Sequence, residues 1–183
     1  MKRLIHMAIL TAILQVLSSS AFGLAGGVDE YLLKAVFFER FTRFVDYGIP
    51  EPDDHEFFVI TVFGENPFEN RLEQVYKDYR ILNKKVKIVY AARIDEIGTP
   101  DILYIGKDKK AELEDLLVHI QGLKTITIAD SPAFSASGVM INLQVIDEKI
   151  RFEIDVEAAA MQNIKFDRIL LINAIIVKHQ TDR

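Results

Sequence analysis

The chain has 183 residues, of which 22 are basic and 27 acidic, so its net charge at pH 7 is -5. This acidic balance argues against binding to a nucleic-acid backbone, which requires a basic face. Half of the residues are hydrophobic and none is cysteine, which disfavours disorder and excludes disulfides, thiol chemistry and thiolate metal sites.

The first 25 residues have the layout of a secretory signal peptide. Lys2 and Arg3 precede an apolar run over 4–17, and Gly23 or Ala25 supplies the small residue at a cleavage point. The run is shorter than the roughly 20 residues of a membrane-spanning helix. We therefore expect export and removal of residues 1–25, with a membrane anchor as the alternative.

Hydrophobic periodicity predicts the elements that follow, in chain order. A helix begins at Val28 or Asp29 and ends near Tyr47, before Gly48 and Pro50. Strands are expected at 56–63, 84–91, 101–105, 124–129, 139–146 and 149–156, and further helices at 67–78, 108–120, 156–162 and 168–178.

This order predicts the fold class. Strands and helices alternate through the middle of the chain, which favours βαβ units and a parallel sheet. The last two strands flank Asp147-Glu148 and are interpreted as a hairpin. We expect one α/β domain over 28–179, with a mixed, mostly parallel sheet, flanking helices in Rossmann-like layering and a C-terminal β-hairpin.

Few residues point to chemistry. The turn 64–67 lies where doubly wound folds bind phosphate, but it has one glycine and no lysine, so a tight turn is the better interpretation. Asp155 and Asp167 each precede a helix and are interpreted as N-caps. The sequence offers no nucleophile motif, catalytic carboxylate pair or histidine pair at metal spacing. We therefore expect no catalysis, no metal and no cofactor.

The segment 130–138 and one arginine form the candidate ligand side. The segment is rich in hydroxyls and small residues, and the candidates in it are Phe134, Ser135, Ser137 and Gly138. Arg151 is added because a guanidinium can hold a carboxylate or phosphate. The alternatives are a packed connection with Phe134 in the core, and a surface ion pair of Arg151 across the hairpin.

The first helix carries the candidate partner surface. Phe38, Phe41 and Phe44 belong to an aromatic set that is larger than one narrow core stripe requires. Exposed members of that set would mark a protein interface. The alternative is ordinary burial against the sheet.

The order and spacing of several short segments resemble the YfiR family of exported regulators, also described as YfiR/HmsC-like, over about 30–177. The matching segments are 31–35, 62–68, 102–105, 125–130, 138–142 and 150–154. That family commonly has Asn where Asp155 stands, and its best-known member uses disulfides in redox sensing. Because this chain has no cysteine, the redox mechanism does not carry over.

The resemblance implies a non-enzymatic periplasmic regulator. Such a protein represses the extracytoplasmic sensor part of an inner-membrane diguanylate cyclase and thereby controls cyclic-di-GMP and biofilm. It also implies a homodimer and a small envelope-derived ligand, and a sensor kinase is another partner to expect. The alternative function is a periplasmic small-molecule binding protein that serves uptake or a sensor kinase.

Overall fold

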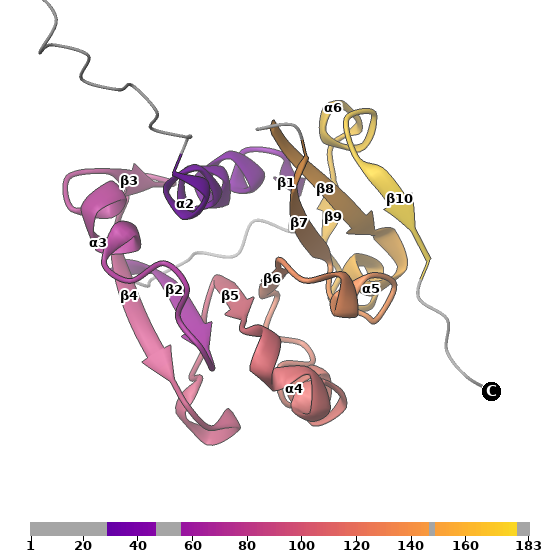
Figure 1. The fold of residues 1–183 in the computed structure, drawn as a ribbon, viewed down its shortest axis with the longest axis horizontal. Helices are drawn as coiled ribbons and strands as arrows, with labels where there is room; N and C mark the ends of the chain where they lie inside the picture. Colours follow the sequence, from indigo (N-terminus) through magenta and orange to yellow (C-terminus); the bar gives the residue numbers. More distant parts are fainter. Residues whose placement is uncertain (1–28, 47–55, 147–148, 179–183) are drawn as a thin grey trace, which may run out of the picture.

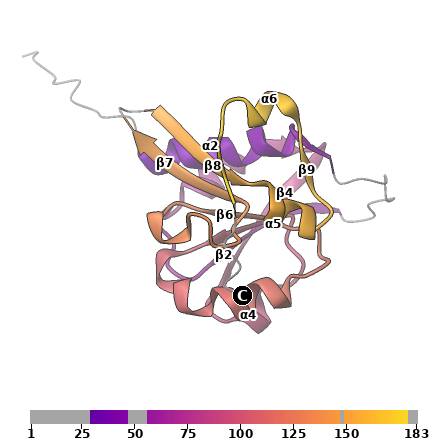
Figure 2. The same cartoon turned by 90° about the vertical axis from the view of Figure 1, so that its right-hand side faces the viewer.

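One eight-stranded sheet organises the fold in the computed structural model, which describes residues 29–46, 56–146 and 149–178. The predicted signal peptide, residues 47–50 and the turn Asp147-Glu148 lie outside these residues. Figures 1 and 2 show helix α2 on one face of the sheet and α4 on the other. The helices are α2 (Glu30–Thr42), α3 (Arg71–Tyr76), α4 (Leu113–His119), α5 (Val156–Met161) and α6 (Arg168–Leu171).

The strands confirm the predicted fold class. In sheet order they are β10 (Ile175–Val177), β8 (Lys149–Asp155), β7 (Ile141–Ile146), β6 (Ile126–Ala129), β5 (Ile102–Ile105), β2 (Phe57–Phe63), β4 (Lys84–Ala91) and β3 (Arg80–Ile81). The strands from β4 to β7 run parallel, and β8 returns antiparallel to β7 as the expected hairpin. Two short strands, β1 (Val45–Asp46) and β9 (Lys165–Phe166), form a separate antiparallel pair.

The central strands are short and apolar because both faces of the sheet are covered. Every residue of β5 and β6 is buried. On one face, α2 inserts Phe38 and Phe41 into the larger core. On the other face, α4 inserts Leu113 and Leu116 into a second core with Phe63 of β2.

Several predicted helices have different bounds in the structure. The first helix, expected to reach Tyr47, ends at Thr42, and Val45–Asp46 form β1 instead. Of the helix expected at 108–120, only Leu113–His119 is α-helical, after a 3-10 helix at Lys107–Glu112. The helix expected at 67–78 begins at Arg71, because the preceding residues form a turn in which the Asn66 side-chain oxygen accepts from the Phe68 amide at 3.0 Å. The helix expected at 168–178 is wrong in its second half. After α6, residues 175–177 form β10, which pairs parallel with β8. Their β-branched side chains favour a strand, and β8 offers an open edge.

Candidate functional site

The strand order places a topological switch point between β2 and β5. From β2 the chain first adds β4 on one side of that strand and then β5 on the other. In open α/β sheets, ligands bind beyond the carboxyl ends of the strands at such a point. Here Gly64 and Gly106 directly follow the two strands, so these glycines flank the crevice where a ligand would be expected.

A carboxylate of the protein itself occupies the position of a ligand phosphate at this crevice. The Glu65 amide donates to Asp108 Oδ1 at 2.8 Å, the contact that a ligand phosphate makes in doubly wound folds. A Cβ atom on either Gly64 or Gly106 would come within 2.6 Å of the same oxygen. Both glycines are therefore needed for the close approach of Asp108, and the turn matches the tight-turn interpretation better than a phosphate site.

A buried ionic cluster lies beside the crevice, where β6 ends. The ammonium group of Lys34 lies 2.7 Å from Asp130 Oδ2, and the two side chains are only 3% and 7% exposed. The Tyr104 hydroxyl donates to the other oxygen, Asp130 Oδ1, at 2.7 Å. Glu30, one turn earlier in α2, approaches Lys34 at 2.5 Å from the surface. The cluster therefore joins α2 to the carboxyl ends of β5 and β6.

The cluster perturbs the tyrosines around it. Burial, reinforced by the negative charge of Asp130, raises the pKa of Tyr31 to about 12. The same two causes raise the pKa of Tyr104 far above its ordinary value. The Lys34 ammonium also lies 4.5 Å from the centre of the Tyr31 ring, a cation–π contact. Both phenols therefore stay protonated at neutral pH and act as hydrogen-bond donors.

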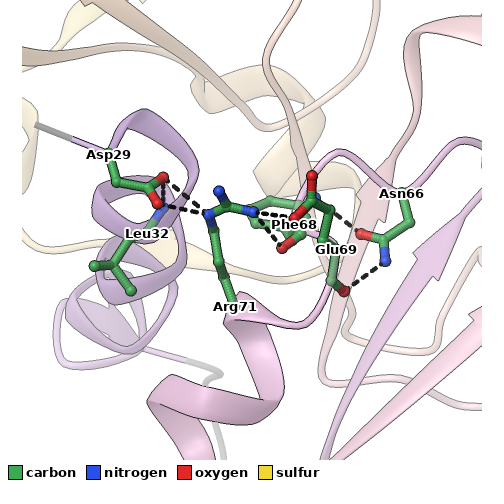
Figure 3. Close-up of polar contacts among 6 residues, drawn as sticks. All are labelled: Asp29, Leu32, Asn66, Phe68, Glu69 and Arg71. Atoms are coloured by element: carbon green, nitrogen blue, oxygen red, sulfur yellow. Dashed lines mark hydrogen bonds and ion pairs between the residues drawn. The ribbon is translucent and has the colours of Figure 1, made fainter. Parts of the chain in front are cut away.

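A second polar cluster fixes the start of α2, as Figure 3 shows. Asp29 caps the helix by accepting from the Leu32 amide at 3.1 Å, and its carboxylate also accepts from Arg71 Nε at 2.7 Å. Arg71 begins α3 and also pairs with Glu69 at 2.9 Å. Hydrogen bonding from Arg71 is the main reason that the pKa of Asp29 lies below its ordinary value. The N-terminal end of α2 is thus tied to α3.

The predicted ligand residues of the loop 130–138 lie in different surroundings. Phe134 is fully buried in the second core, as the packed-connection alternative held. Ser135 is half-buried, and its amide closes the turn around Phe134. Ser137 and Gly138 line a groove of about 720 Å³ between α4 and α5.

Arg151 does not join this loop. It is exposed on β8 and lies opposite Gln144, four residues along β7 from Met140 at the groove. That separation is roughly 13 Å along an extended strand. The structure therefore brings Ser137 and Gly138 together at one groove and places Arg151 elsewhere.

The three predicted partner residues also divide. Phe38 and Phe41 are at most 1% exposed, and they pack against Phe68 and Phe152 at ring-centre distances of 5.4 and 5.3 Å. This burial corrects their assignment to a partner surface, because a contact would require the core to repack. Phe44 is half-buried and lines a groove of about 480 Å³ between α2 and α3.

Both predicted N-caps are confirmed. Asp155 Oδ1 accepts from the amides of Glu157 and Ala158 at 3.0 and 2.9 Å. Asp167 Oδ1 accepts from the Ile169 amide at 2.6 Å. These aspartates therefore start α5 and α6.

Two classes of site were searched for in the described residues. No group of three or more histidine, aspartate or glutamate side chains there is arranged to hold a metal ion. Within the same ranges, no helix combines the length and the apolar character that a bilayer crossing requires.

These features define the class of protein: an α/β domain in which a carboxylate of the chain binds the amide at the switch point and in which open grooves lie along the helices. The particular family follows from a sequence comparison. The YfiR/HmsC-like family model matches residues 31–174, so the chain belongs to that family. No curated protein matches the chain.

Proposed function

We propose that this protein is a non-enzymatic periplasmic regulator. It binds and represses the extracytoplasmic sensor part of an inner-membrane signalling protein of the diguanylate cyclase type, and so controls cyclic-di-GMP and biofilm. The family match over residues 31–174 is the observation that carries the proposal. Switching requires that an incoming ligand binds the free and the partner-bound forms with different affinity.

The partner surface that we propose is the α2–α3 groove, defined by Val36, Phe44, Val75, Tyr76 and Tyr79 with Glu39, Arg40 and Arg43. Its floor is largely apolar, and Tyr79 at its rim is 44% exposed. Tyrosine and arginine are the residue types that dominate the binding energy of protein interfaces. We therefore still propose that the first helix contributes to the partner surface, but through a different set of residues.

The two arginines of the groove indicate which chemical groups the partner places there. Arg43 is held within the protein by Glu39 and by the Tyr79 hydroxyl. Arg40 instead lies over the Phe37 ring at 5.2 Å, and in the described part of the chain no carboxylate pairs with it. We infer that the partner places an apolar anchor in the groove and a carboxylate on Arg40.

Affinity co-purification of the tagged chain from gently solubilised envelopes tests this proposal. Recovery of a membrane cyclase or sensor kinase, identified by mass spectrometry, is the expected result. Arg40→Glu and Tyr79→Ala should each reduce that recovery at least about tenfold. Arg93→Glu, which reverses an exposed charge in the turn after β4, is the matched control and should leave recovery unchanged.

Absence of any membrane signalling protein from the eluate would contradict the regulator. Retention of a tightly bound small molecule in its place would support the alternative, a binding protein that serves uptake. Recovery that survives both groove variants would move the partner surface away from α2.

We also propose a homodimer that forms through the open edge of β10. Ile175 and Ile176, neighbours on opposite faces of this edge strand, are 51% and 47% exposed. Residues 169–177 contain no charged side chain, so two copies can meet there without repulsion in an otherwise acidic chain. Unpaired backbone groups at such an edge readily accept another strand.

A further inference from the structure

The groove between α4 and α5 contains an unusual combination of apolar wall and unpaired charge. Its walls come from Leu117 and Val118 of α4 and Met161 of α5, and Thr127 and Met140 also line it. Val118 and Met161 are 69% and 66% exposed, although each contributes to this concave surface. A volume of about 720 Å³ lies within the usual range of small-molecule sites.

Two opposite charges stand on one wall of the groove. Lys110 and Glu114 both line it, four residues apart in the continuous helical segment that leads into α4. The Lys110 ammonium lies 5.3 Å from the centre of the buried Phe134 ring. Among the described residues, neither Lys110 nor Glu114 has an ion-pair partner, although four residues is the spacing at which such pairs commonly form.

The charge pattern narrows the class of occupant. A purely anionic amphiphile would be attracted by Lys110 and repelled by Glu114, and a cationic one would meet the reverse. A zwitterionic headgroup satisfies both, with its anion on Lys110 and its ammonium on Glu114. The rest of the lining is mixed: Gln121, Gln162, Thr127 and Ser137 are polar, whereas Leu117, Val118, Met140 and Met161 offer apolar surface to a hydrocarbon chain, whose burial adds affinity.

We propose that this groove binds a single-chain phospholipid whose headgroup carries a phosphate and an amine. Its phosphate lies at Lys110, its ammonium at Glu114, and its acyl chain runs between α4 and α5. Ser137 and Gly138 of the loop 130–138 close one side of the site, which gives them the ligand-side role predicted from the sequence. The inference rests on the proposed function in that such a lipid would be the regulator's envelope-derived ligand.

The positions of the methionines provide a direct test. The chain has four, at 1, 7, 140 and 161, and the last two both line the groove. In the full chain labelled with ¹³C at the methionine methyls, lysophosphatidylethanolamine with a 12-carbon chain, below its micelle concentration, should shift both groove signals. Glycerophosphoethanolamine, which is the headgroup without the chain, should leave them in place.

Substitutions then separate the headgroup from the chain contacts. Lys110→Gln and Glu114→Gln should each weaken binding of the labelled protein about fivefold, as expected for charge contacts near the surface. Val118→Asp should weaken it at least about tenfold by placing a charge against the chain. Leu82→Asp, at a 56% exposed apolar position between β3 and β4, is the matched control and should bind as the unchanged protein does.

Several outcomes would overturn the proposal. One such outcome is that lysophosphatidylglycerol binds as tightly as the amine lipid and that Glu114→Gln has no effect. This result would show that the site does not recognise the headgroup as a zwitterion. Binding that leaves the Met140 and Met161 signals unmoved would place the lipid elsewhere, and absence of binding would dismiss the site. Because these measurements use the purified chain alone, recovery of the membrane partner would still stand if they failed.

Discussion

Lys34 is a charged residue in a position that the helix pattern assigns to the core. It lies on the buried stripe of α2 with Ala35, Phe38 and Phe41, and its side chain is 3% exposed. A buried ammonium group is tolerated only where carboxylates surround it. Asp130 and Glu30 supply them, so the sheet and the helix are joined by an ion pair that neither element could bury alone.

Removing the buried carboxylate should be costly. Asp130→Asn removes the buried negative charge and replaces one of the two acceptor oxygens by an amide group that can only donate. Lys34 thereby loses its buried counter-ion, and we expect the free energy of unfolding to fall by about 3 kcal/mol. Glu30→Gln removes the other carboxylate, which is 47% exposed, and should lower it by less than about 1 kcal/mol. Urea unfolding measures the free energy of unfolding of both variants. Equal decreases would contradict the expectation that the more buried carboxylate contributes more.

Tyr31 makes stability depend on alkaline pH. Because its pKa is about 12 in the fold and about 10 in an unfolded chain, its contribution is fully present below pH 10 and is lost between pH 10 and about 12. In Tyr31→Phe, the stability of the fold should therefore decrease less steeply as the pH rises across this window. Thermal unfolding at pH 9, 10 and 11 measures the slope, and identical slopes in the two proteins would contradict the expectation.

At the scale of elements, the Asp29–Arg71 contact links two helices through a titrating group. The pKa of Asp29 is lowered, chiefly by the hydrogen bond from Arg71, so its contribution is present above the ordinary value of 3.8 and is lost as the pH falls through the lowered value. Arg71→Gln should remove part of the acid dependence of unfolding. Lys77→Gln, an exposed position just after α3, is the control and should leave the acid limb unchanged.

Helix α5 depends on a single side-chain oxygen. Asp155→Ala removes the acceptor for two backbone amides and should lower the free energy of unfolding by about 1–2 kcal/mol. Asp155→Asn keeps that acceptor and should lower the free energy of unfolding by only about a few tenths of a kcal/mol. Chemical unfolding of both variants provides the comparison, and equal losses would mean that the charge of Asp155 matters more than its capping.

The elements show where sequence reasoning succeeds and where it stops. The strands around 57–63, 102–105 and 126–129 were predictable because fully buried parallel strands are continuous apolar runs. The two caps were predictable because an aspartate before a helix has a local partner. The strand at 175–177 was not, since a short apolar run takes its conformation from the neighbour it pairs with, and β8 is a partner that periodicity does not reveal.

The same limit applies to the candidate site. Loop composition singled out Ser137 and Gly138, which the structure places at the α4–α5 groove, whereas Arg151 was grouped with them because sequence gives no distance across a hairpin. Phe38 and Phe41 were assigned to a surface because aromatic content alone does not fix which way a helix faces. The one available signal that was missed is Lys34, since a lysine inside an apolar stripe requires a buried acid elsewhere in the chain.

For the whole molecule, the open edge of β10 predicts self-association. Ile176→Lys places a charge on this edge and should shift the proposed dimer to monomer by at least about tenfold in the dissociation constant. Sedimentation velocity over a range of concentrations measures the shift. Leu82→Lys, at a 56% exposed apolar position beside the opposite edge, is the control. A chain that is already monomeric at high concentration would remove the dimer from the proposed function.

The carboxylate of Asp108 has a consequence for the proposed setting in nucleotide signalling. The position at which related sheet architectures sense a nucleotide is occupied here by a group that is covalently attached and negatively charged. A ligand phosphate would have to displace it against both steric exclusion and charge repulsion. A nucleotide phosphate is therefore not expected to bind at this switch point, so a response of this domain to nucleotides would need a different site.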